Sequence, residues 1–249
     1  MSITGSPLAV GSLGWLKGDF LFQQQGTKTI FAATGVSAYQ GTISTLVLDQ
    51  GEGAFVISPD GIAGYLQGRA QAAVTGVSIG GNVILRINTT GKAVDEVVVV
   101  GGQSLTIHFG EDEGSIFLIA VSSLEVNVAD VAYVQGSFTY VQKTVTGEST
   151  KADTFAGTGI TVFFGSGPYR LANGDINPLA KGLLLTNATI GLIKLGSAVA
   201  LDAIGTVQTV GFTDAGLSGT VHVRVNSFAH DLNELLPVVG TDSSVTVAF

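Results

Sequence analysis

Cysteine is absent from the 249 residues, which excludes disulfide bonds, cysteine-based zinc sites and thiol nucleophiles. Charged residues make up only 12% of the chain, about half the usual share. Basic residues are the scarcer kind, with 11 Lys and Arg against 19 Asp and Glu, so the net charge is -8. Because nucleic-acid binding needs a positive surface, we expect no nucleic-acid partner.

Long hydrophobic runs are also missing. The longest uncharged stretches, such as residues 29–48, are interrupted by Gly, Ser, Thr and Gln and alternate in polarity. A membrane-spanning helix needs about 20 consecutive apolar residues, so we expect no transmembrane helix. Residues 1–20 contain no basic segment followed by an apolar one, so we expect no signal peptide within this chain.

What the chain has in abundance is glycine, 35 residues, and apolar residues, 45% of the total. Val, Ile, Thr, Phe and Tyr alternate with small polar residues in runs bounded by Gly, Asn and Asp, which predicts β-strands almost everywhere. One short helix is expected, over 229–236. The clearest predicted strands cover residues 15–23, 30–39, 83–88, 104–109, 122–128, 131–142 and 221–226.

The two halves of the sequence align with each other. The matching residues keep their order, and the offset between the copies only grows along the chain, which indicates two copies of one repeat, 1–109 and 110–249. The matching sets are Gly18, Phe20, Phe22 with Gly136, Phe138, Tyr140; Phe31, Ala32, Thr34, Gly35, Gly41 with Phe155, Ala156, Thr158, Gly159, Gly165; Gly81, Val83, Arg86, Asn88, Glu96 with Gly219, Val221, Arg224, Asn226, Glu234; and Thr106, Phe109 with Thr246, Phe249.

Glycine also recurs in the middle of predicted strands, at Gly18, Gly68, Gly136 and Gly219. Such glycines favour strand bending or close backbone packing. The sequence therefore predicts an all-β fold of two tandem homologous antiparallel repeats. Each repeat is a sandwich or curled-sheet module, and the two are stacked into an elongated body.

A segment in the first copy, LRINTTGKAVDE (Leu85–Glu96), resembles the β-rich repeats strung in tandem in very large secreted bacterial surface proteins, adhesin-like or matrix-like. The TNATIGLI segment from Thr186 and the SGTVHVRVN segment from Ser218 resemble the same repeat. In the second copy Asn226-Ser227-Phe228-Ala229 replaces the Asn-Thr-Thr-Gly turn of the first. The resemblance implies an extracellular or cell-surface array module with no chemistry of its own.

Catalytic motifs are weak. The string Gly76-Val77-Ser78-Ile79-Gly80 matches GxSxG, but a strand is predicted after it, where a nucleophile elbow needs a helix. The three histidines are His108, His222 and His230, and we expect all of them to be ordinary strand or surface residues. We therefore predict that the protein is not an enzyme.

Acidic turns are the only candidate ligand sites. Carboxylates in turns are hard oxygen ligands that suit Ca²⁺, although no EF-hand spacing is present. Solvated acidic turns that keep an apolar chain soluble are the competing interpretation. Arg86 with Glu96, and Arg224 with Glu234, are expected to pair across neighbouring strands. The candidate calcium ligands are Asp49, Glu52, Glu111, Asp112, Glu113 and Asp175.

These observations favour a non-enzymatic structural or adhesive module that associates with copies of itself, end to end, into filaments. One alternative is a glycan-binding module that uses exposed rings at Trp15, Tyr65 and Tyr169. A second is an outer-membrane β-barrel, since the chain ends in an alternating strand that finishes at Phe249.

Overall fold

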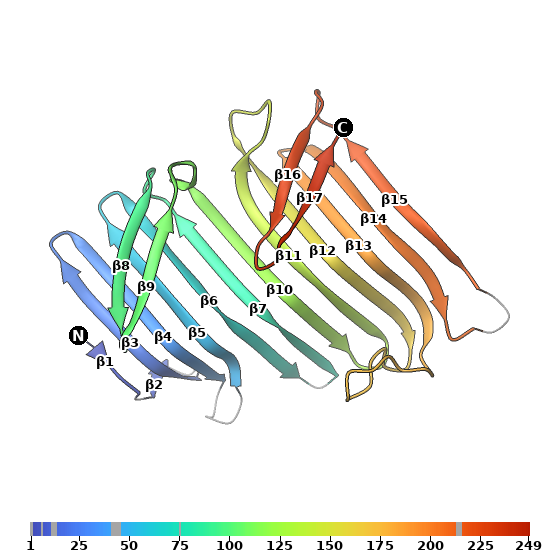
Figure 1. Ribbon diagram of the computed structural model, residues 1–249, viewed down its shortest axis with the longest axis horizontal. Coiled ribbons are helices and arrows are strands. Elements are labelled where there is room, and N and C mark those ends of the chain that lie inside the picture. Colours follow the sequence, from blue (N-terminus) through green and yellow to red (C-terminus); the bar gives the residue numbers. More distant parts are fainter. Residues whose placement is uncertain (1, 6, 11–13, 41–45, 75, 213–215) are drawn as a thin grey trace. The chain divides into compact units, whose positions relative to one another are not determined.

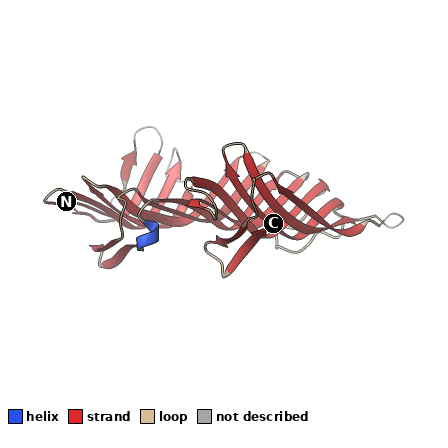
Figure 2. Ribbon diagram, turned by 90° about the horizontal axis from the view of Figure 1, so that it is seen from above, coloured by secondary structure: helices blue, strands red, loops and turns tan. Residues whose placement is uncertain are grey.

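The structure is a computed structural model that describes residues 2–5, 7–10, 14–40, 46–74, 76–212 and 216–249. Apart from one turn of 3₁₀ helix, the regular structure in these ranges consists of strands (Figure 2), and the strands of the sheets and hairpins described below pair antiparallel. The all-β prediction is therefore confirmed. The chain forms two compact units, residues 1–72 with 82–119 and residues 73–81 with 120–249.

Unit 1 contains a sheet and a separate hairpin. The sheet follows the order β1-β3-β4-β5-β6, with β2 also paired to β3, and the hairpin is formed by β8 and β9. The 3₁₀ turn η1 (Glu111–Glu113) follows the hairpin. The strands are β1 (Ser2–Ile3), β2 (Leu8–Val10), β3 (Gly14–Gln25), β4 (Lys28–Gln40), β5 (Leu46–Ser58), β6 (Gly61–Val74), β8 (Val94–Val100) and β9 (Gln103–Phe109).

Unit 2 has a sheet in the order β11-β12-β13-β14-β15 and a hairpin formed by β16 and β17. β7 (Val77–Asn88) and β10 (Ile116–Val128) are hydrogen-bonded neighbours, and each has residues in both units. The strands of unit 2 are β11 (Ala132–Thr144), β12 (Lys151–Ser166), β13 (Lys181–Leu195), β14 (Ala198–Val210), β15 (Ser218–Asn226), β16 (Asn233–Val238) and β17 (Ser243–Ala248).

The core of each unit lies between its sheet and its hairpin. In unit 1, β9 alternates strictly, so Leu105, Ile107 and Phe109 are buried against Ala32 and Ala54 of the sheet. In unit 2 the hairpin is packed on the sheet in the same way (Figure 1), and its buried side chains include Leu236, Val238, Val245 and Val247. Small sheet residues leave the space that the larger hairpin residues fill.

Glycine bends the sheet of each unit in mid-strand. Gly35 in β4 and Gly159 in β12 have φ values of 59° and 60°, a left-handed conformation that favours glycine. Opposite them the pairing register shifts across Gly18 and across Gly136, as in a β-bulge. A side chain at Gly18 would meet the Thr34 carbonyl oxygen at 3.0 Å. Bending and close packing are thus confirmed at Gly18 and Gly136, whereas an added Cβ atom at Gly219 would meet nothing within 4 Å.

The helix expected over 229–236 is wrong. Strand β16 begins at Asn233, and Glu234, Leu236 and Val238 are buried while the residues between them are exposed. The segment therefore follows the two-residue period of a strand rather than the period of a helix, because alternate side chains point into the core of unit 2. Among the described residues, no helix is long and apolar enough to cross a membrane.

Candidate interaction surface

Four of the six predicted calcium ligands accept hydrogen bonds from protein groups. Glu52 accepts a hydrogen bond from Gln67 Nε2 at 2.6 Å, and Asp49 accepts one from Ser37 Oγ at 3.2 Å. Asp175, in the loop after β12, accepts a hydrogen bond from Asn173 Nδ2 at 2.7 Å.

In η1, Glu111 and Asp112 are exposed, whereas Glu113 is half-buried and bound to Arg86. Within the described ranges, no three His, Asp or Glu side chains gather closely enough to hold a metal ion. The calcium site stays a prediction.

Glu113 joins three elements of unit 1. Its carboxylate accepts hydrogen bonds from Arg86 at 2.6 and 3.2 Å and from the Gly110 amide at 3.1 Å. Burial raises the pKa of Glu113, but these donors outweigh that effect and the pKa lies below its ordinary value. Arg86 also donates to the His108 carbonyl oxygen at 2.9 Å and lies 4.8 Å from the Phe109 ring centre. This arrangement fixes β7, η1 and β9 together.

The predicted Arg86–Glu96 pair is wrong, because Arg86 binds Glu113 and Glu96 binds Lys28. The predicted Arg224–Glu234 pair is wrong as well. Arg224 binds Asp202 at 3.0 Å, across from β15 to β14. The arginines and glutamates of each pair lie on different elements, so equal sequence spacing did not place them opposite each other.

Glu234 anchors the hairpin of unit 2 instead. Its carboxylate lies 2.7 Å from Lys143 Nζ and accepts the Thr146 amide at 2.6 Å, and the residue is only 6% exposed. Burial raises the pKa of Glu234, yet the hydrogen bonds from Lys143 and Thr146 hold it below its ordinary value. Sequence reasoning missed this network because Lys143 and Thr146 are far from Glu234 in the chain.

The catalytic motifs do not assemble a site. Ser78 lies within β7, and the strand continues after Gly80 as predicted, so the helix that a nucleophile elbow needs does not follow the GxSxG string. His222 Nε2 is 2.8 Å from Asp202 Oδ1, and His230 Nε2 is 3.1 Å from the Thr146 carbonyl oxygen. His108 lies 3.9 Å from Asp95 on an exposed face.

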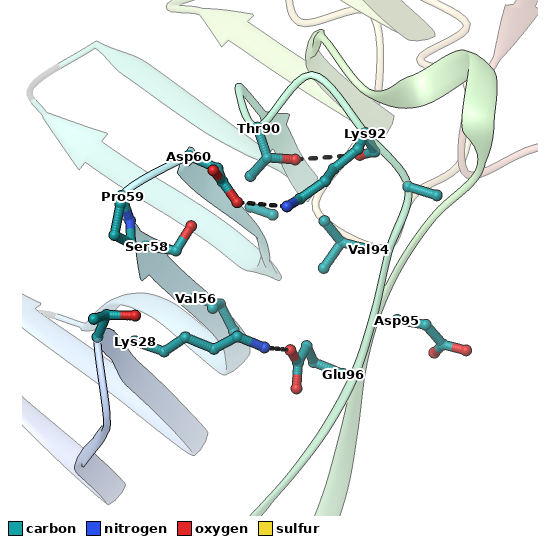
Figure 3. A pocket seen from close by; sticks show the side chains of 13 residues that line it. Lys28, Val56, Ser58, Pro59, Asp60, Thr90, Lys92, Val94, Asp95 and Glu96 are labelled. Atoms are coloured by element: carbon teal, nitrogen blue, oxygen red, sulfur yellow. Dashed lines mark hydrogen bonds and ion pairs between the residues drawn. The ribbon is translucent and has the colours of Figure 1, made fainter.

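A charged pocket of about 350 Å³ lies in unit 1, between the sheet and the start of β8 (Figure 3). Lys92 Nζ is 2.5 Å from Asp60 Oδ2, and Lys28 binds Glu96 on the opposite wall. Asp95 points away from both pairs. The two lysines are thus each neutralised by a carboxylate, and the pocket is polar without a free cation among these residues.

The rings proposed for glycan binding differ in their exposure. Tyr169 is 5% exposed and packs against Tyr133 and Phe163, with ring centres 5.2 Å away in both cases. Trp15 and Tyr65 are half-buried. The expected exposure is wrong for Tyr169, which lies in a core cluster with Tyr133 and Phe163, whereas Trp15 and Tyr65 remain partly exposed.

An apolar cleft of about 500 Å³ lies on the sheet of unit 2. It crosses β11 to β15, and two valines of the last strand, Val221 and Val223, form one side of it. Because its lining is almost entirely apolar, the cleft is suited to apolar side chains rather than to a charged ligand. The other lining residues are Val134, Phe138, Phe155, Ile160, Val162, Leu185, Ala188, Thr189, Ile190, Ala203, Ile204, Gly205 and Val207.

β15 is the strand that borders this cleft. Among the described strands it pairs with β14 alone, so its other edge offers unpaired backbone groups. Val221, Val223 and Val225 are 48%, 45% and 46% exposed. Natural sheets usually protect such edges with lysine, proline or a bulge. β15 has none of these, and Arg224 is held by Asp202. We call β15 and the cleft the edge surface.

No protein-family model, curated protein or solved structure matches this chain. The edge surface was not predicted from sequence. The alternating valines of β15 predicted a strand, but which strand ends the sheet depends on the whole topology.

Proposed function

We propose that the protein is a non-enzymatic structural module, made of two copies of one β repeat, that associates with further copies through the edge surface. The exposed valine edge of β15 is the observation that carries this function. Strand addition at a sheet edge satisfies backbone hydrogen bonds and buries side chains at the same time.

Strand register supports the duplication. In unit 1, Ala33 pairs with Gly53, Val36 with Gly51 and Ala38 with Leu48. In unit 2, Gly157 pairs with Ile190, Ile160 with Ala188 and Val162 with Leu185. The two sets have the same spacing on both strands, including the interruption at the bulge. Two unrelated sheets have no reason to share an irregular register.

The turn after β7 and the turn after β15 also support it. The Asn88 side chain donates to the Lys92 carbonyl oxygen and accepts the Thr90 amide at 3.0 Å. The Asn226 side chain donates to the His230 carbonyl oxygen and accepts the Phe228 amide at 3.0 Å. The second copy therefore forms the same asparagine-capped turn although its sequence departs from Asn-Thr-Thr-Gly.

An arginine and an aromatic ring complete the correspondence. The Arg86 guanidinium lies 4.8 Å from the Phe109 ring centre and donates to the His108 carbonyl oxygen. The Arg224 guanidinium lies 4.7 Å from the Phe249 ring centre and donates to the Ala248 carbonyl oxygen. In each case the arginine fastens the end of the hairpin to the sheet.

The resemblance to repeats of large bacterial surface proteins supports the part of the proposal that assigns this module to an extracellular array. The two lysines of the charged pocket of unit 1 are each paired with a carboxylate of the same unit. The edge surface is by contrast large and apolar. Association, rather than chemistry on a small molecule, is what this distribution of groups supports.

Sedimentation velocity over a range of concentrations tests the proposal. We expect the wild type to form larger species as concentration rises and Val223→Lys to remain monomeric, because the substitution puts a charge on the edge. Val97→Lys is the matched control, since Val97 is 65% exposed on the β8–β9 hairpin. A wild type that stays monomeric at every concentration, or equal effects of the two substitutions, would contradict the proposal.

A further inference from the structure

The outer edge of β15 has no partner strand among the described strands, whereas β7 is paired with β10 within the same chain. A Cβ atom added at Gly81 of β7 would meet β10, with Val121 Cγ1 at 3.0 Å and Leu124 Cα at 3.2 Å. A Cβ atom added at Gly219 of β15 would meet nothing within 4 Å. Gly219 matches Gly81 in the sequence alignment. β15 is thus built like β7, without the strand that β7 has beside it.

The segment that resembles β10 lies before β3. Gly5 has a φ of 64°, and its amide donates to Asp19 Oδ1 at 3.1 Å. Ser123 in β10 has a φ of 52°, and its amide donates to Ser137 Oγ at 3.1 Å. These residues keep the same offset that relates Gly18 to Gly136. The segment of β1 and β2 (residues 2–5 and 7–10) therefore lies beside β3 as β10 lies beside β11.

We propose that β15 of one copy of the chain receives the β1–β2 segment of a second copy, in the arrangement that β7 and β10 adopt within one chain. This inference rests on the proposed function and names its partner strand. The contact joins two different surfaces, so it repeats from copy to copy and extends the sheet head to tail. Matching Gly81 and Val121 to their counterparts brings Gly219 near Ile3, and Val221 follows two residues further along β15 on the same face.

The two surfaces are chemically matched. Val221 and Val223 line the apolar cleft of unit 2. Ile3 pairs directly with Phe20, and both belong to an apolar cluster of unit 1. Phe20 is the counterpart of Phe138, which lines the cleft. The added strand would therefore bring apolar side chains to the rim of the cleft and bury the exposed valines.

Strand β1 (Ser2–Ile3) carries neither a charge nor a proline, and Pro7 lies outside it, between β1 and β2. β1 and β2 pair with β3 and with no other described strand. Thr4 and Gly5 are exposed and uncharged, and Ile3 is half-buried. Ile3, Thr4 and Gly5 carry no ionisable side chain, so none of them would bring a charge to β15.

Disulfide trapping tests the inference, because the wild type has no cysteine. One preparation carries Val221→Cys and a second carries Ile3→Cys, and the two are mixed and oxidised with diamide. A disulfide forms only when the Cα atoms come within about 7 Å. We expect a disulfide-linked dimer of one chain of each kind, at a yield at least tenfold above that of Val97→Cys mixed with Ile3→Cys. Thr4→Cys, at an exposed residue, replaces Ile3→Cys should that variant fail to fold.

The outcomes separate the two proposals. A dimer of two Val221→Cys chains, without the mixed dimer, would overturn the inference and leave self-association through β15 standing. Equal yields with Val97→Cys would overturn the inference as well. A wild type that stays monomeric in sedimentation would overturn the proposed function itself. Mixed dimers that disappear when Val223→Lys is added to the Val221→Cys chain would support both.

Discussion

Replacing Asn88 tests how far one side chain holds the hairpin of unit 1 in place. Asn88 is 0% exposed, and its amide group makes four hydrogen bonds. Nδ2 donates to the carbonyl oxygens of Lys92 and Glu113 at 2.9 and 3.0 Å. Oδ1 accepts from the amide and the hydroxyl of Thr90 at 3.0 and 2.8 Å. Asn88→Ala removes all four at once.

The magnitude follows from what alanine leaves behind. Each buried polar group that loses its partner costs about 1–3 kcal/mol. Lys92 and Thr90 are accessible enough for water to replace part of the loss, whereas the Glu113 carbonyl oxygen lies beside buried Gly114. We therefore expect Asn88→Ala to lower the free energy of unfolding of unit 1 by about 3 kcal/mol. For a urea dependence of about 2 kcal/mol per molar, the midpoint falls by about 1.5 M.

Urea denaturation followed by tryptophan fluorescence is the assay, because Trp15 is the single tryptophan and lies in unit 1. The matched variant is Asn226→Ala, measured by circular dichroism. Asn226 is half-buried and makes two such bonds, one of them 3.3 Å long, so about 1 kcal/mol is expected. Equal losses in both variants, or a loss below about 0.5 kcal/mol for Asn88→Ala, would refute the reasoning.

Three further predictions concern stability. Glu234→Gln should destabilise unit 2 by about 2 kcal/mol at pH 7, since it removes a buried charge partner. Because the folded-state pKa of Glu234 is lowered from 4.5, its contribution is present above that pH and is lost as the pH falls through the folded value, so urea midpoints of variant and wild type should converge in acid. Gly35→Ala should cost about 1 kcal/mol in urea melts for its left-handed φ, whereas Gly80→Ala, with open space and no positive φ, should be neutral; equal effects would contradict this. EDTA should leave the melting temperature unchanged, and a fall on chelation would instead support the acidic turns as calcium sites.

The strands could be predicted from the sequence because alternation is a local property. Residues 104–109 show it well, since Leu105, Ile107 and Phe109 are buried and the residues between them are exposed. The bulge at Gly35 was also within reach, because glycine in mid-strand has few explanations other than a bend or a close backbone. In both cases the signal lies within a few residues of the feature.

The ion pairs could not be predicted, because they depend on which strands become neighbours. Arg86 and Glu96 have the same sequence spacing as Arg224 and Glu234. Yet Arg86 binds Glu113 in η1, and Glu96 binds Lys28 in the sheet. What the two arginines share in the structure is the contact with an aromatic ring at the end of a hairpin, Arg86 with Phe109 and Arg224 with Phe249. Spacing along the chain reports repetition and not the partner.

The edge surface also could not be predicted from the sequence, because it depends on which strands become neighbours in the sheet. A single exposed valine needs no explanation, since much of any protein surface is apolar. Three alternating valines lie on an unpaired edge beside an apolar cleft. Such an edge favours aggregation, which would be a liability unless association is the function of the protein. Within the chain, the strand that matches β15 is covered by β10. Under the proposed function, a second copy of the chain supplies the partner strand for β15, as β10 supplies one for β7 within the chain.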